Sequence, residues 1–148
     1  IVSLLSDLTA RNPDSRELLS GLLHYADVRG VQFIAPMPDL NMFKASAAYA
    51  NFARAKQLSG CSFIGADLRH AHFAYADLGK SHFVTADLTD ATLQGADLRG
   101  ANLCLANLSG TELFDAKYDD DTEWPRGFSP PTDKWTGDSA EPTDNGRV

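Results

Sequence analysis

The chain lacks any long apolar run and has only two cysteines among its 148 residues. Its longest apolar stretches, Ile1–Leu5 and Cys61–Ile64, fall far short of the roughly 18 residues that a membrane helix needs. Two cysteines cannot form a disulfide framework, so we expect free thiols in a reducing compartment, that is, a cytoplasmic location. The sequence therefore predicts no membrane span in this chain.

Basic residues are also few, with 13 Lys plus Arg against 20 Asp plus Glu and a net charge of -7. Acidic proteins are repelled by nucleic acids, so we expect no direct nucleic acid binding. The charge is uneven: residues 1–25 carry 3 acids and 2 bases, residues 26–118 carry 9 and 8, and residues 119–148 carry 8 and 3. Most of the excess negative charge therefore belongs to the C-terminal end.

Catalytic motifs are missing as well. The sequence has no nucleophile paired with a base, no glycine-rich phosphate loop and no metal-ligand spacing. His70, His72 and His82 lie close in sequence, but no cysteine or carboxylate completes a tetrahedral set around them. The sequence predicts a protein that is not an enzyme and has no metal or cofactor.

What the sequence does contain is a repeat of five residues. From Cys61 to Asp120 twelve blocks follow one another without interruption, with a large apolar residue at the third position of each. The first position is Ala in nine of the twelve blocks, and the second is always polar. A period of five matches neither a helix nor a flat strand.

Four such blocks can close one square coil of about 20 residues, and coils stacked at the 4.8 Å strand spacing bury the first and third positions. Corner turns then fall at the fourth and fifth positions, where the positive φ that a turn can need is easiest for glycine; the glycines at these positions are Gly65, Gly79, Gly95, Gly100 and Gly110. The tandem A(D/N)LXX pattern resembles the pentapeptide repeat family. The resemblance implies a right-handed quadrilateral β-helix, an all-β solenoid, and we expect about five coils in a bacterial protein.

The pattern is weaker upstream of Cys61. Residues 26–35 read as two starting blocks, and residues 45–59 resume the repeat one residue out of phase. That offset fits a coil with a one-residue bulge. The alternative for residues 36–60 is an Ala-rich helix from Leu40 to Leu58, capped by Asp39 and stopped by Gly60.

Both ends of a solenoid need covering. We expect an N-terminal helical cap at residues 1–25, the β-helix at 26–120, a C-terminal cap segment at 121–128 and a flexible acidic tail at 129–148. The cap segment carries Trp124 and Phe128 in a W-P-x-G-F sequence that resembles the closing segment of the family. The chain opens without Met, which favours a piece of a longer protein.

Residues twenty apart should stack on one face. Such a column contains Ile64, Val84 and Cys104, with Trp124 next and Leu105 beside it, and we interpret it as a candidate docking stripe. It predicts a non-catalytic interaction or scaffolding module that binds a protein partner or a second copy as a homodimer. The alternative explanation is that the cap or tail covers the stripe.

Two other functions stay open. Some pentapeptide repeat proteins resemble B-DNA and bind DNA gyrase, and the residues to weigh for such mimicry are the ladders Asp67, Asp87, Asn107 and Asp77, Asp97, Lys117. Between residues 61 and 118, however, seven acids face four bases, a lower charge density than that of a duplex. The chain could also be the repeat domain of a larger, membrane-attached protein.

Overall fold

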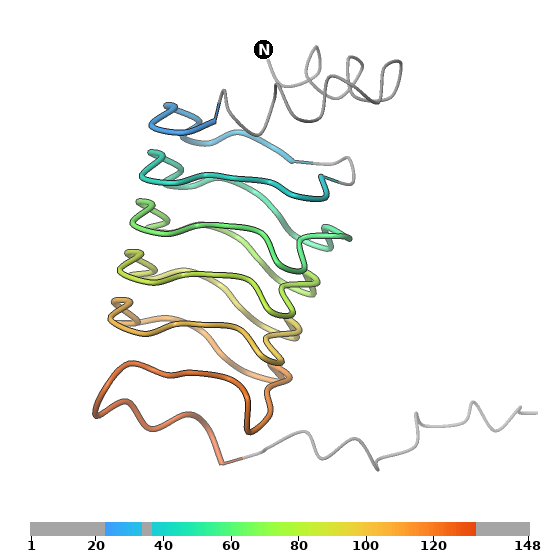
Figure 1. Ribbon diagram of the computed structural model, residues 1–148, viewed down its shortest axis with the longest axis vertical. Coiled ribbons are helices and arrows are strands. Elements are labelled where there is room, and N and C mark those ends of the chain that lie inside the picture. Colours follow the sequence, from blue (N-terminus) through green and yellow to red (C-terminus); the bar gives the residue numbers. More distant parts are fainter. Residues whose placement is uncertain (1–22, 34–36, 133–148) are drawn as a thin grey trace, which may run out of the picture.

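A computed structural model of the chain describes residues 23–33 and 37–132. Figure 1 shows these residues as coils that stack along one vertical axis, each coil lying directly over the next. The small first position and the large third position of each block point inward, as Ala66 and Leu68 do with at most 1% of their surface exposed. The five-residue period thus produces a solid column of side chains at the centre of the coils.

Backbone hydrogen bonds hold successive coils together. The Leu68 amide donates to the Asp87 carbonyl oxygen at 2.8 Å, and the Asp87 amide donates to the Ala66 carbonyl oxygen at 3.0 Å. Each coil side contributes only one bridging residue, the second position of its block, and every bridge is parallel. The described residues therefore form isolated bridges, with no longer strand and no helix among them.

The bridging residues form four columns, which define the four faces of the β-helix. Face 1 contains Asp27, Ser46, Asp67, Asp87 and Asn107; face 2 contains Gln32, Asn51, His72, Thr92 and Glu112; face 3 contains Asp77, Asp97 and Lys117; and face 4 contains Asn41, Ser62, His82, Asn102 and Glu123. The column of face 1 has five levels, in agreement with the coil number that the repeat predicts.

Stacked phenylalanine rings fill the upper core. Phe52 and Phe73 stack with ring centroids 4.7 Å apart, and Phe63 and Phe83 stack at 4.9 Å. The two stacks meet edge to face, with Phe63 and Phe73 at 5.6 Å and an interplanar angle of 86°. Edge-to-face contacts between aromatic rings stabilise a core beyond the area they bury, so these rings fix one coil against the next.

The corners need positive φ at the fifth position of the block. Glycine supplies it at Gly95 and Gly110, but side chains such as Tyr75, Thr85 and Leu105 adopt the same conformation with φ between 59° and 61°. A left-handed backbone costs a non-glycine residue about 1 to 2 kcal/mol. The hydrogen bonds of the stacked coils offset this cost at each corner.

Residues 37–60 continue the coils, and the alternative of an Ala-rich helix from Leu40 to Leu58 is wrong. Asn41, Ser46 and Asn51 bridge to residues 21 positions later, whereas the bridges between Ser62 and Lys117 join residues 20 apart. The extra residue lies in a six-residue block at 55–60, in which Ala55 and Leu58 are both buried. The predicted one-residue bulge is therefore present.

The N-terminal helical cap predicted at residues 1–25 lies almost wholly outside the described residues, which begin with a turn at 23–25. At the other end, Trp124 stacks on Phe128 at 5.3 Å and meets Tyr118 edge to face at 5.3 Å. The acidic tail is described only up to residue 132.

Within the described ranges the structure has no helix long and apolar enough to cross a membrane.

Candidate docking corner

Apolar side chains follow one another down the corner between faces 4 and 1. Ile64, Val84 and Cys104 occupy the fourth position of three successive coils, and all three are half-buried. The hydrogen bonds beside them keep this order: the Gly65 amide donates to the Val84 carbonyl oxygen at 2.9 Å, and the Thr85 amide donates to that of Cys104 at 3.2 Å. The structure thus brings together three of the five residues predicted for the docking stripe.

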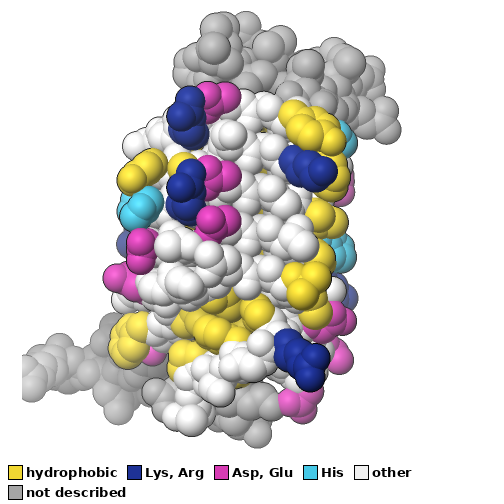
Figure 2. Space-filling model, turned by 90° about the vertical axis from the view of Figure 1, so that its left-hand side faces the viewer, with side chains coloured by type: hydrophobic (Ala, Val, Ile, Leu, Met, Phe, Trp, Pro, Cys, Tyr) yellow, Lys and Arg dark blue, Asp and Glu magenta, His cyan; other side chains and the backbone are white. Residues whose placement is uncertain are grey.

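Leu105 lies next to Cys104 on the same corner and is 73% exposed. It is one of five large hydrophobic residues that the described part of the chain exposes. Figure 2 looks onto face 1 and shows hydrophobic side chains along its right-hand edge, interrupted by basic ones. Leu105 thus places an exposed apolar side chain beside Cys104.

Trp124 does not belong with the stripe. The Leu103 amide donates to the Glu123 carbonyl oxygen at 2.7 Å, and Asn102 bridges to Glu123, which lies 21 residues later instead of 20. One extra residue before Glu123 therefore moves Trp124 under the inward position of Leu103. There it packs against the core with Phe128 and covers the end of the column.

Phe43 extends the stripe upward, although the sequence pattern does not predict it. The Lys44 amide donates to the Ile64 carbonyl oxygen at 2.9 Å, which places Phe43 directly above Ile64. Its ring meets Tyr25 edge to face at 5.7 Å, and the Lys44 ammonium lies 5.3 Å from the ring centroid. Phe43 lies 21 residues before Ile64, so a strict period of twenty does not find it.

We call the set Phe43, Ile64, Val84, Cys104 and Leu105 the apolar corner. Its lower end borders a carboxylate, since the Cys104 thiol donates to Glu123 Oε2 at 3.3 Å. This hydrogen bond to Glu123 raises the pKa of the Cys104 thiol.

Cys61 lies in the core, where burial raises the pKa of its thiol to about 11. The two cysteines are free thiols.

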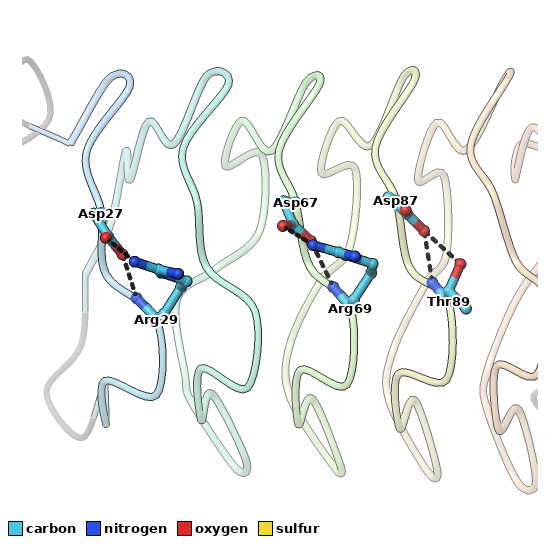
Figure 3. Close-up of polar contacts among 6 residues, drawn as sticks. All are labelled: Asp27, Arg29, Asp67, Arg69, Asp87 and Thr89. Atoms are coloured by element: carbon cyan, nitrogen blue, oxygen red, sulfur yellow. Dashed lines mark hydrogen bonds and ion pairs between the residues drawn. The ribbon is translucent and has the colours of Figure 1, made fainter.

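The predicted acidic ladders are present, but arginines pair with them. Asp67 bridges to Asp87 on face 1, and Asp77 bridges to Asp97 on face 3. Arg69 donates two hydrogen bonds to the Asp67 carboxylate, at 2.8 and 2.7 Å, as Figure 3 shows. The same two-residue spacing joins Arg29 to Asp27 and Arg99 to Asp97.

These pairs change the charge that the faces present. The side-chain hydrogen bonds from Arg69 and Arg99 hold the pKa values of Asp67 and Asp97 below their usual range. Asp87 has Thr89 two residues later, where Asp67 has an arginine, and accepts hydrogen bonds from the Thr89 amide at 3.0 Å and from its hydroxyl. The carboxylates thus stabilise corner turns, and two of the four aspartates in the ladders, Asp67 and Asp97, are paired with an arginine of the same block.

The three histidines lie on two different faces and a corner. His72 bridges on face 2 and His82 on face 4, while His70 stacks on Tyr49 at the corner between faces 1 and 2, with ring centroids 4.7 Å apart. Across residues 23–33 and 37–132, no group of three His, Cys, Asp or Glu side chains could hold a metal ion.

An open hollow of about 450 Å³ lies on face 3, lined by Asp77, Asp97 and Arg99 together with Lys56, Tyr75 and Lys117. Asp97 and Arg99 form an ion pair at 2.5 Å. Two acids and three bases line this hollow, so it presents no concentrated charge of either sign to a ligand.

Known proteins resemble the chain in both sequence and fold. The model of the family described as pentapeptide repeats matches residues 50–90 and 86–117 with eight copies. A pentapeptide repeat protein from the thylakoid lumen of Arabidopsis thaliana is 30% identical with a TM-score of 0.65, covering 68% of this chain and 70% of that one. No curated protein sequence matches the chain.

Two further solved structures match the chain, both with lower TM-scores. A pentapeptide repeat protein from Nostoc PCC 7120 is 34% identical over 72% of both chains, with a TM-score of 0.34. A plasmid-mediated fluoroquinolone resistance protein is 19% identical over 64% of this chain and 51% of that one, with a TM-score of 0.40. The second similarity is too distant to carry an argument about function.

Proposed function

Because the chain belongs to the pentapeptide repeat family and has its right-handed quadrilateral β-helix, we propose that it is a non-catalytic module that binds a protein through the apolar corner. The observation that carries this proposal is the unbroken order of Phe43, Ile64, Val84 and Cys104 on one corner, with Leu105 73% exposed beside them. Apolar side chains that gather on one part of a protein surface mark an interaction site.

The backbone supports the same proposal. The apolar corner is carried by stacked coils whose amides bond to the coil below at 2.9 to 3.2 Å. Its side chains keep their spacing before a partner arrives, so little conformational entropy is lost when the partner binds. A rigid apolar ridge of this kind fits a groove on another protein.

Mimicry of DNA is the weaker candidate. Arg29, Arg69 and Arg99 each pair with the aspartate two residues before them. A face that imitates a duplex needs unpaired negative charge at the density of the phosphates. These ion pairs therefore count against gyrase modulation by charge mimicry.

We also propose a reducing compartment, such as the cytoplasm, as the location. Both cysteines are free thiols, and Cys61 is buried in the core of the coils. The alternative location is the thylakoid lumen, where the similar Arabidopsis protein is found. Fractionation of the source cells followed by immunodetection decides between the two.

A comparative capture experiment tests the docking proposal. Immobilised wild-type protein and the variants Val84→Asp and Ser109→Asp are exposed to extract of the source cells, and bound proteins are quantified by mass spectrometry. Ser109 is an exposed fourth-position residue on a different corner, so it is the matched control. We expect a protein that wild type and Ser109→Asp retain and Val84→Asp loses; equal recovery by all three overturns the proposal.

A further inference from the structure

We propose that the hollow on face 3 is a binding site for a neutral sugar ring, either a free sugar or one unit of a glycan. The proposal concerns a different surface and a different class of ligand from the apolar corner, so it stands apart from the proposed docking function. It rests on the size of the hollow, on the aromatic ring at its edge and on one carboxylate that the chain itself leaves unpaired.

The hollow has the dimensions of a small-molecule site. Its volume is about 450 Å³, which lies in the range of pockets that hold small ligands. It extends along face 3 over successive coils, from Lys56 to Lys117. Gly95 contributes no side chain at its edge, so a ligand can approach the backbone there. Size and access therefore suit one or two sugar rings.

Tyr75 supplies an aromatic platform at the edge of the hollow. Its side chain is 48% exposed, and its ring lies in the space that a Cβ atom at Gly95 would occupy. The backbone of Gly95 thus supports the ring from one side, and the exposed part of the ring lines the hollow. Aromatic rings bind apolar groups through their faces, and the C–H face of a sugar ring is such a group.

The carboxylate of Asp77 is the unusual feature of the hollow. Asp67, Asp87 and Asp97 each accept a hydrogen bond from the amide two residues later. Among the residues that the structure describes, none donates a hydrogen bond to the Asp77 carboxylate or forms an ion pair with it. Gly79 stands at the block position where Asp67 and Asp97 have an arginine. The half-buried carboxylate of Asp77 therefore keeps its acceptor positions for the hydroxyl groups of a ligand.

The charges around the hollow favour a neutral ligand. Asp97 is paired with Arg99 at 2.5 Å, which leaves Asp77 between the positive charges of Lys56 and Lys117. An anion would meet the aspartate and a cation would meet the lysines, so either is opposed by part of the site. A hydroxyl group can donate to a carboxylate and accept from an ammonium group, and both hydrogen bonds are strengthened by the charge. A sugar offers several hydroxyl groups beside an apolar ring face.

Two other hollows do not combine these features. The hollow of about 320 Å³ beside Lys80 shares Asp77, but no aromatic side chain lines it. The hollow of about 420 Å³ beside Trp124 is aromatic, but the Asp119 carboxylate that lines it already accepts a hydrogen bond from the Gly100 amide at 2.9 Å. Of the three, the hollow on face 3 joins an exposed aromatic ring to an unpaired carboxylate.

An NMR titration of the full chain tests the site. Amide shifts of the isotope-labelled protein are followed while D-glucose, D-galactose or D-mannose is added up to about 50 mM, a range that suits the millimolar affinity of so small a ligand. We expect at least one sugar to shift the amides of Tyr75, Asp77 and Gly95 in a saturable way. If none of the three sugars does so, or if the shifts occur only on other faces, the proposal is overturned.

A second series with the methyl glycosides distinguishes the two sources of the sugar. A methyl group at the anomeric oxygen stands for the rest of a glycan chain. Saturable shifts of the same amides by a methyl glycoside support a glycan as the ligand, whereas shifts by the free sugar alone support a free sugar.

A pair of tyrosine variants tests the aromatic platform. Tyr75→Ala should raise the dissociation constant of the sugar about fivefold, because the stacking surface is lost. Tyr75→Phe keeps the ring and should bind as the wild type does. Tyr49→Ala is the matched control, since Tyr49 is a 59% exposed tyrosine at the same block position of another corner. Equal effects of Tyr75→Ala and Tyr49→Ala would contradict stacking on Tyr75.

A pair of aspartate variants tests the carboxylate. Asp77→Asn removes the charge from the acceptor and should raise the dissociation constant about fivefold. The coil accepts asparagine at this block position, as Asn102 and Asn107 show. Asp87→Asn makes the same substitution on face 1, away from the hollow, and should bind as the wild type does. Unchanged affinity in Asp77→Asn, or an equal loss in Asp87→Asn, would show that Asp77 does not hold the sugar and would overturn the site.

Discussion

The ring of Tyr75 lies directly over Gly95 of the next coil, in the space that a Cβ atom at Gly95 would occupy. Gly95 also has a φ of 62°. Glycine is therefore favoured at this corner for two reasons: it adopts the left-handed backbone conformation, and its lack of a side chain leaves room for the aromatic ring of the coil above.

Gly95→Ala should lower the free energy of unfolding by about 2 kcal/mol, of which about 1 kcal/mol arises from the positive φ and the rest from displacement of Tyr75. Gly60→Ala is the control, because Gly60 has a φ of 74° and no atom within 4 Å of the added Cβ. Chemical denaturation measures both. Equal losses for the two variants would show that Tyr75 moves aside without cost.

Phe73→Ala should lower the free energy of unfolding by about 3 to 5 kcal/mol, because it removes a ring from the middle of the aromatic core and leaves a cavity. Phe73→Leu should cost about 1 kcal/mol, since Leu93 occupies the same inward column one coil below and is fully buried. Denaturation curves of the two variants test this ranking. A loss from Phe73→Leu as large as that from Phe73→Ala would contradict it.

Asp97→Asn should remove about 0.5 kcal/mol of stability at neutral pH, the usual size for a pair that solvent reaches. The Arg99 hydrogen bond lowers the pKa of Asp97, so the pair stabilises the fold above about pH 4, the ordinary carboxyl pKa. The contribution disappears as the pH falls through the lowered pKa. Unfolding free energies of wild type and variant between neutral and acid pH should therefore converge, and a constant difference would refute the assignment.

Cys104 should react with iodoacetamide in the folded protein, and Cys61 should not. Cys104 is half-buried on the apolar corner, whereas Cys61 is 1% exposed and its pKa is about 11. Glu123→Gln should speed the reaction of Cys104 several-fold, because the Glu123 carboxylate raises the pKa of that thiol. Mass spectrometry of the alkylated peptides follows both sites, with urea-unfolded protein as the control in which both react.

The sequence predicts the coils well because every block follows the same pattern. A small first residue and a large third residue point inward, and a polar second residue lies between them. It locates Ile64, Val84 and Cys104 for the same reason. It fails where one extra residue shifts the register: Phe43 and Trp124 are both misplaced by a strict count of twenty. Thr85 and Leu105 at positive φ could not be predicted from propensity either, because stacking of the coils imposes that backbone conformation.

The most direct test of the docking function uses the thiol of Cys104 as a reporter. A thiol-reactive photo-crosslinker is attached to Cys104, and in a second protein to a cysteine introduced by Ser109→Cys in a Cys104→Ser background, while Cys61 stays buried in both. After illumination in extract of the source cells, the account predicts a discrete crosslinked protein from position 104 and none from position 109. The same products from both positions would contradict a docking site at the apolar corner.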